Sequence, residues 1–244
     1  MKHVDVVIIS WAKNDELLQI AKNGLDSLFK SDWNDIAFHA YIVESNKDIK
    51  YEDMPEYQKK WMHSVQTIHP DTEFGYHKYL NIGRKAGNSP YVVLCNSDLT
   101  FGKGWASSII QVMEHYPQFL SASPWCPQTQ GDSSSAIGNV YEGYQVRGEI
   151  AGWCIFQQRK IYETLGDLDE RFKFWYCDND YSCELQLKNI MHCLVPHSIV
   201  NHHENRVGKT ADTLSPSENF EITEAQRVIF ENKWEKYMQP NPIQ

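Results

Sequence analysis

The hydrophobic positions of this chain form two recurring patterns, short continuous apolar runs and longer amphipathic stretches. Residues 4–10 are a nearly continuous β-branched run, residues 14–30 carry leucines at helical spacing, and residues 36–43 form a second apolar run. A continuous apolar run is typical of a parallel strand covered on both faces, whereas the 3.6-residue spacing indicates a helix. The three segments therefore predict a β-α-β unit with a right-handed crossover.

The same alternation continues along the chain. Segments 44–62 and 128–148 interrupt it, because the first is polar with a proline and the second is rich in glycine and serine, and both are expected to be largely irregular. Strands alternating with helices predict an open, mostly parallel α/β sheet. Further strands are expected at 65–69, 91–95, 119–123, 150–157, 193–196 and 199–203, and further helices at 76–86, 105–116, 159–165, 178–188 and 223–237.

Polar residues follow directly after three of the expected strands. These are Ser10 and Trp11, then Glu44 to Asn46, then Asn96 to Asp98. In open α/β sheets, ligands bind at the carboxyl ends of the strands. The pattern therefore predicts that three polar strand ends line one crevice.

Composition narrows the class of protein. A chain of 244 residues that is 41% hydrophobic can bury a large core. No window approaches eighteen consecutive apolar residues and the N-terminus leads directly into a strand pattern, so we expect no transmembrane helix, no signal peptide and a cytoplasmic protein without stable membrane insertion. With 23 Lys and Arg against 32 Asp and Glu the net charge is −9, so an overall basic nucleic-acid footprint is absent.

The six cysteines contain no Cys-x-x-Cys pair and lie mostly among apolar neighbours. This spacing favours reduced, buried thiols over a disulfide framework or a zinc site.

Asp98 is the first candidate for chemistry. An aspartate after a strand is either a turn or capping residue or a ligand for Mg²⁺ or Mn²⁺, which prefer hard oxygen donors and the phosphates of a substrate. A second ligand is offered by the adjacent pair His202 and His203, either of which can present an imidazole nitrogen to Mn²⁺. Their alternative role is structural, and the sequence does not decide which histidine faces the site.

The second candidate cluster is the stretch from Phe172 to Glu184, which contains Asp178 and Asp180. Aspartates at a helix start are favoured by capping and by the macrodipole, which allows a purely structural role. The aromatic residues before them predict an apolar wall, however, and such a wall raises the pKa of a carboxyl group and suits it to general-base work. Aromatic faces also stack on sugar rings.

Several common sites are missing from the sequence. There is no P-loop, no Rossmann GxGxxG, no Gly-x-Ser-x-Gly elbow and no HExxH, which disfavours kinases, dehydrogenases, serine hydrolases and zinc proteases. A nucleotidyltransferase would share the sheet and the metal-bound phosphates. It normally has a glycine-rich basic loop after the first strand, and the stretch SWAKNDE has no glycine and one lysine.

Taken in order, these elements resemble the family-two-type glycosyltransferases of the GT-A fold, from Val4 to about Lys209. The stretch YLNIGRKAGNSPYVVLCNSDL is similar to the segment leading to that family's Asp-x-Asp motif, with Asn96, Ser97 and Asp98 in its place. The stretch GDLDERFKFWYCDNDYSCEL is similar to its Gly-Phe-Asp-Glu-x-Phe and Glu-Asp-x-Asp region, with Asp178 on the catalytic base. The chain departs from the family at Asn96, at Cys177, and at Glu44 to Asn46, where an aspartate usually reads the nucleotide base.

The resemblance implies a fold, a reaction and a set of sites. It implies a Rossmann-like open mixed sheet over 1–214, with a nucleotide-sugar half at about 1–100 and an acceptor half at about 101–214, followed by a helical tail at 215–244. It implies a metal-dependent, inverting transfer from a nucleoside-diphosphate sugar, UDP-sugar favoured, with Mn²⁺ or Mg²⁺ on Asp98 and His202. Donor contacts are expected from Ser10, Trp11, Glu44, Asn81, Arg84, Asn96, Ser97, Arg206 and Lys209, and acceptor contacts from Trp153, Trp175, Tyr176 and Asp180.

The acceptor stays open at this point. Glycans, other hydroxyl compounds and hydroxylated DNA bases of viral type all remain compatible, because tryptophan and tyrosine stack on sugars and bases alike. The loop with Arg206 and Lys209 is either a closing element over the donor or a solvated basic turn. A sugar-nucleotide-binding protein without catalysis is the alternative function, since Asn96 and Cys177 depart from the family motifs.

Overall fold

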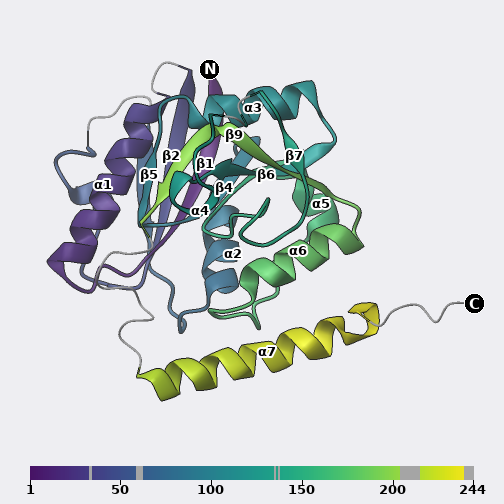
Figure 1. Ribbon diagram of the computed structural model, residues 1–244. Coiled ribbons are helices and arrows are strands. Elements are labelled where there is room, and N and C mark those ends of the chain that lie inside the picture. The colour runs from purple at the N-terminus through teal and green to yellow at the C-terminus, as the bar shows by residue number, and fades with distance from the viewer. Residues whose placement is uncertain (33–34, 59–62, 135, 137, 204–214, 239–244) are drawn as a thin grey trace, which may run out of the picture.

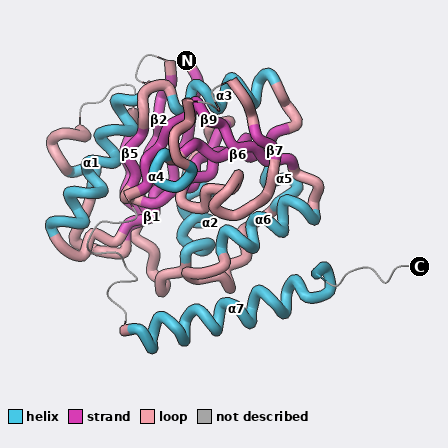
Figure 2. Tube along the Cα trace, viewed as in Figure 1, coloured by secondary structure: helices cyan, strands magenta, loops and turns pink. Residues whose placement is uncertain are grey.

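The structure is a computed structural model that describes residues 1–244 except 33–34, 59–62, 135, 137, 204–214 and 239–244. Its centre is a nine-stranded mixed sheet in the order β3-β2-β1-β4-β8-β6-β9-β5, with β7 paired to β9. Figure 2 shows the strands gathered in the middle with helices around them. The strands are β1 (Lys2–Ser10), β2 (Ile36–Glu44), β3 (Ser64–Ile68), β4 (Tyr91–Asn96), β5 (Leu99–Phe101), β6 (Phe119–Trp125), β7 (Tyr141–Glu142), β8 (Cys154–Gln158) and β9 (Met191–His202).

The N-terminal half of the sheet is parallel. β1 pairs with β2 and with β4 in parallel register, so that Ser10 lies opposite Glu44 and Ile9 lies opposite Asn96. β8 then runs antiparallel between β4 and β6, and β9 returns parallel to β6. The polar ends of β1, β2 and β4 therefore meet at one edge of the sheet, as the sequence predicted.

Helices cover both faces of the sheet (Figure 1). Alternate residues of β1 belong to different hydrophobic clusters, because successive side chains of a strand point to opposite faces. On one face lie α1 (Asp15–Ser31) and α3 (Trp105–His115), and on the other α2 (Tyr76–Ala86), α5 (Tyr162–Leu165) and α6 (Cys177–Leu187). The long α7 (Pro216–Met238) runs beside α6 (Figure 1), and short helical turns are η1 (Tyr51–Asp53), α4 (Pro127–Gln130) and η2 (Arg159–Ile161).

Most predicted elements are present with boundaries shifted by a few residues. The exceptions have local causes. The two short strands expected at 193–196 and 199–203 are one strand, β9, whose pairing with β6 jumps from Val195 to Ile199 around Pro196, a residue without an N–H to donate. The helix expected at 159–165 is the turn η2 followed by the single turn α5. The strands β5 and β7, of three and two residues, were not predicted.

All six cysteines are free thiols, five of them buried, as predicted, and Cys183 is half-buried. In the described part of the chain, no helix combines the length and the apolar composition that a membrane crossing needs.

Candidate active site

The ends of β1 and β2 are held together by a carboxylate that has no exposed surface. Glu44 Oε1 accepts hydrogen bonds from the Ala12 amide at 3.0 Å and the Asn46 amide at 2.8 Å, and Tyr51 donates to its other oxygen at 3.4 Å. The Asn46 side chain in turn donates to the Ala12 carbonyl at 2.7 Å. Glu44 therefore fixes the loops after both strands, which corrects the expectation that its carboxylate faces a nucleotide base.

Ser10 and Trp11 differ sharply in exposure. The Ser10 side chain is buried, with its hydroxyl 3.3 Å from the Tyr51 hydroxyl, so it belongs to the support under this edge. Trp11 is 43% exposed, and the Lys13 ammonium lies 5.1 Å from the centre of its ring. Of the two, Trp11 is the one that presents a surface to a ligand.

Asp98 lies between β4 and β5, and His202 at the end of β9 faces it. His202 Nε2 is 3.4 Å from Asp98 Oδ2, because β5 and β9 pair with Leu99 opposite His202. His203 turns away, since its amide donates to the Asp98 carbonyl at 3.1 Å and its Nε2 lies 2.7 Å from the Thr100 hydroxyl. The structure thus places His202, and not the side chain of His203, against the Asp98 carboxylate.

The His202 ring is also stacked on Trp153, with ring centres 5.3 Å apart and planes 18° apart. Burial pushes the pKa of Asp98 up, but the hydrogen bond and the charge of His202 outweigh it and hold that pKa below its ordinary value. Asp98 is therefore ionised at neutral pH. A carboxylate oxygen beside an imidazole nitrogen is a donor set that suits Mn²⁺.

If Asp98 and His202 hold a metal ion, its other ligands have to come from a substrate or from water. Among the described residues, no group of three or more His, Cys, Asp or Glu side chains is arranged to hold a metal. Two protein ligands still fit a divalent cation that keeps waters and binds substrate phosphates. The residues present are therefore compatible with Mn²⁺ or Mg²⁺ brought together with a diphosphate.

Asp178 is joined to the Asp98 region through Gly152 and Tyr76. A Cβ built on Gly152 would lie 2.6 Å from the Asp178 Cβ, so the backbone at 152 packs directly on the carboxylate side chain. The Tyr76 hydroxyl lies 3.1 Å from the Gly152 carbonyl and 2.9 Å from Asn96 Oδ1. The charges of both Asp178 and Asp98 contribute to the raised pKa of Tyr76, after its burial and two cysteines. Both carboxylates are therefore linked to the surroundings of one tyrosine, Asp98 through the neighbouring Asn96 and Asp178 through Gly152.

Burial raises the pKa of the half-buried Asp178, opposed by the Asn179 amide, which donates to Oδ1 at 3.0 Å, and by the charge of Arg147. A carboxyl group with a raised pKa is a stronger base when it is ionised. The two carboxylates at this site are consequently shifted in opposite directions, Asp98 down and Asp178 up. This separation is typical of sites in which one carboxylate stays charged and another exchanges a proton.

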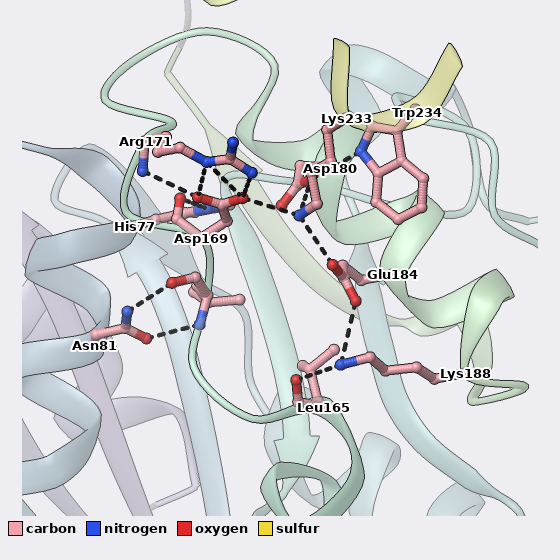
Figure 3. Close-up of polar contacts among 11 residues, drawn as sticks. His77, Asn81, Leu165, Asp169, Arg171, Asp180, Glu184, Lys188, Lys233 and Trp234 are labelled. Carbon is pink, nitrogen blue, oxygen red and sulfur yellow. Dashed lines mark hydrogen bonds and ion pairs between the residues drawn. The ribbon is translucent and has the colours of Figure 1, made fainter. Parts of the chain in front are cut away.

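Asn81 and Arg84 are not on the crevice. Both side chains are buried on α2 and bind the 166–170 segment, Asn81 through two hydrogen bonds to the backbone of Leu168 and Arg84 through an ion pair with Asp167. His77, one turn earlier, contacts the Asp169 carbonyl at 3.0 Å (Figure 3). The helical spacing of 77, 81 and 84 makes one face of α2 a clamp for this segment, which corrects the expected donor contacts of Asn81 and Arg84.

Three of the expected acceptor residues contact α7, Asp180 from a buried position and Trp175 and Tyr176 from half-buried ones. Asp180 accepts a hydrogen bond from Trp234 Nε1 at 2.9 Å and lies 2.7 Å from Lys233 Nζ (Figure 3), and it is almost fully buried. Trp175 donates to Asn219 at 3.2 Å, and the Tyr176 ring packs against Phe230. The expectation that Asp180 meets an acceptor is corrected, because α7 already occupies that side of α6.

The remaining expected residues fall into two groups. Asn96, Ser97 and Trp153 lie at the end of β4 beside Asp98, with the Asn96 amide donating to the Trp153 carbonyl at 3.0 Å. Arg206 and Lys209 lie outside the described residues. The role of their loop over the donor therefore stays a prediction.

Two residues of the site were missed by the sequence reasoning. Tyr76 is the first residue of α2 and was taken only as part of a helical pattern, and Gly152 was taken as part of a strand. The glycine carried a signal, since an isolated glycine in a strand pattern marks a close approach of backbone. Tyr76 carried none, because its partners Asn96 and Gly152 are distant in sequence.

The chain has the GT-A fold of glycosyltransferases, as comparison with solved structures shows. GalNAc-T7 with UDP, GalNAc and Mn²⁺ matches with a TM-score of 0.68 at 15% identity, over 96% of this chain and 50% of that one. S. aureus TarS with UDP-GlcNAc matches with a TM-score of 0.67 at 15% identity, over 95% of this chain and 67% of that one. The mannosyltransferase PcManGT of Pyrobaculum calidifontis with GDP-Man and Mn²⁺ matches with a TM-score of 0.58 at 12% identity, over 84% of this chain and 58% of that one.

This chain is similar to these enzymes in fold and spans about half the length of GalNAc-T7. No protein-family model matches the sequence, and no curated protein matches it either. The three structures hold nucleotides or nucleotide sugars, two of them together with Mn²⁺.

Proposed function

We propose that this protein is a metal-dependent inverting glycosyltransferase that moves a sugar from a nucleoside-diphosphate sugar, UDP-sugar favoured, to an acceptor hydroxyl. The observation that carries the proposal is the chain of contacts that joins the regions of Asp98 and Asp178 through Asn96, Tyr76 and Gly152. Asp98 faces His202, and Asp178 packs against Gly152. The pKa of Asp98 is lowered and that of Asp178 is raised, which supports different roles for the two groups. Similarity in fold to enzymes bound to UDP, UDP-GlcNAc and GDP-Man supports the donor class.

The donor side has to bind and orient a diphosphate. Asp98 and His202 would hold Mn²⁺ or Mg²⁺, which when bound offsets the negative charge that develops on a departing diphosphate. Trp11 offers an exposed aromatic face beside this edge for the nucleotide base. The Tyr76 hydroxyl donates to Asn96 Oδ1, which fixes that side chain at the position where the related motif has its first aspartate.

The acceptor side has to remove a proton. Asp178 accepts the proton of the acceptor hydroxyl while the hydroxyl oxygen forms a bond to the anomeric carbon and the bond to the diphosphate breaks. Attack from the face opposite the leaving group inverts the anomeric centre. The backbone at Gly152 holds the carboxylate at this point, and the next residue, the buried Trp153, stacks on His202 and so connects this backbone to the Asp98 side.

The acceptor class is proposed as a carbohydrate or another hydroxyl compound. A hydroxylated DNA base is the second possibility within this function, and the net charge of −9 disfavours it. Hydrolysis of the donor needs no acceptor, so it can be measured whichever acceptor class is correct.

The test is a screen of purified protein against UDP- and GDP-sugars with Mn²⁺, with Mg²⁺ and with EDTA. We expect nucleoside diphosphate to raise the Tm only with metal, by mass action, and we expect slow release of nucleoside diphosphate from one sugar nucleotide. Binding without any turnover would favour the catalytically inactive alternative. If no sugar nucleotide or nucleoside diphosphate raises the Tm and none is turned over, the proposal is overturned.

A further inference from the structure

The back of the helix that carries Asp178 is held by a lysine from the C-terminal helix. Lys233 of α7 lies 2.7 Å from Asp180, 2.9 Å from Glu184 and 3.1 Å from Asp169 (Figure 3). Asp180 and Glu184 are one turn apart on α6, and Asp169 comes from the clamped 166–170 segment. One ammonium group therefore joins three carboxylates from two segments of the chain.

This cluster lies on the opposite side of α6 from the site. Residues two apart on an α-helix differ by about 200° in direction, so Asp178 and Asp180 point to opposite sides. Asp178 packs on Gly152, and Asp180 packs on Lys233 and Trp234. A contact made by Lys233 thus reaches the carboxylate only through the backbone of the first turn of α6.

That first turn needs external support. Tyr176, the residue before α6, has φ of 61°, in the left-handed region that residues other than glycine rarely adopt, and its side chain makes no capping hydrogen bond to the helix. The first backbone hydrogen bond of the turn runs from the Asp180 amide to the Tyr176 carbonyl at 2.8 Å. The Tyr176 ring packs on Phe230 of α7, with ring centres 5.3 Å apart.

The charge arrangement makes Lys233 the central partner. Asp180 is almost fully buried, with Lys233 and the neutral Trp234 as its polar partners, whereas Asp169 also binds the exposed Arg171 and Glu184 also binds Lys188. Without Lys233, a buried carboxylate next to the first turn would lose its cation, and breaking such a pair is strongly destabilising.

We propose that Lys233 is a positioning residue for the proposed reaction, holding the first turn of α6, and through it Asp178, in place from the side opposite the substrate. The inference rests on the proposed function and adds the C-terminal helix to the catalytic apparatus. It assigns Lys233 no contact with donor or acceptor.

The experiment uses the full chain with Lys233→Met, Lys233→Arg and a matched control, Lys236→Met. Lys236 is an exposed lysine of the same helix whose ammonium lies over the neighbouring Tyr237 ring. For Lys233→Met we expect donor turnover to fall about tenfold or more, since small misplacements of catalytic groups are costly. UDP affinity with Mn²⁺ should stay within about twofold, because the Asp98 side does not involve α6. Lys233→Arg should restore most of the turnover, and Lys236→Met should match the wild type.

Amide hydrogen exchange supplies a readout that needs no activity. In Lys233→Met the Asp180 and Tyr181 amides should exchange about tenfold faster or more than in the wild type, while the amides of β1 stay unchanged. Equal acceleration throughout the chain would mean a general loss of stability and would overturn the inference, as would unchanged exchange at 180 and 181. If the wild type binds no UDP and turns over no donor, the proposed function fails, and this comparison still decides whether Lys233 orders the start of α6.

Discussion

The two sides of the site are built in different ways. On the donor side, Asp98 follows a strand in the middle of the sheet and meets His202 because two strands pair in register. On the side of the proposed base, Asp178 lies in the first turn of α6, whose support comes from Gly152, from the 166–170 segment and from α7. The difference teaches that the sheet itself fixes the proposed metal ligands, whereas the proposed base depends on side-chain contacts between elements far apart in sequence.

Replacing Asp178, the proposed base, should give the largest contrast between the two sides, because turnover should fall while UDP affinity is kept. We expect Asp178→Asn to lower turnover by about 10²- to 10⁴-fold, because the amide cannot accept the acceptor proton. Affinity for UDP with Mn²⁺ should stay near that of the wild type, as measured by calorimetry. An equal loss of affinity and turnover would show that the sides are not independent.

The pH should act on the two sides at different points. Burial raises the pKa of Asp178, so as the pH falls this group takes up a proton first, and turnover should drop about tenfold per pH unit below that pKa. His202 holds the pKa of Asp98 below its ordinary value, so Asp98 stays ionised to lower pH. Turnover measured at saturating donor and metal across the acid range should therefore fall with the protonation of Asp178, and the same fall in Asp178→Asn would contradict the assignment.

Gly152→Ala tests the packing under the base. The new methyl group would lie 2.6 Å from the Asp178 Cβ, so the carboxylate or the backbone has to move. Overpacking of this kind costs about 1–3 kcal/mol of unfolding free energy, and we expect turnover to fall about tenfold. Steady-state kinetics and thermal unfolding give both values, and wild-type turnover would show that Asp178 does not need this contact.

The smallest effect is expected at Glu44. Glu44→Gln keeps an oxygen for the Ala12 and Asn46 amides and weakens the contact with Tyr51, so the unfolding free energy should fall by about 1 kcal/mol. UDP affinity should stay within about twofold, with the exposed Asp48→Asn as control. A large loss of UDP affinity at unchanged Tm would instead support the expectation that Glu44 recognises the nucleotide base.

The donor side was predictable from sequence to a larger extent than the base side. Continuous apolar runs located β1, β2 and β4, and parallel pairing then placed their polar ends together. Those patterns could not say whether a polar side chain at a strand end points outward or inward, and Glu44 points inward. His202 was separated from His203 only by the pairing of β5, a strand of three residues that has too few positions for a periodic pattern.

The base side could be predicted only in outline. The helix start at Asp178 was expected, but Asp180 was assigned to an acceptor from the family resemblance. Its partners Trp234 and Lys233 lie more than fifty residues further along the chain. No local pattern shows that an amphipathic tail will cover a particular carboxylate. The same holds for Asn81 and Arg84, whose partners at 167 and 168 are set by the packing of α2.

Cys183 gives this architecture a built-in chemical probe. It is half-buried beside the cluster that α7 forms with α6, while the other five thiols are buried, and burial raises its pKa to about 11. A maleimide should therefore alkylate Cys183 before any other thiol, and slowly as long as the C-terminal helix stays docked. The labelling rate would then report how often α7 detaches from α6 in the wild-type chain.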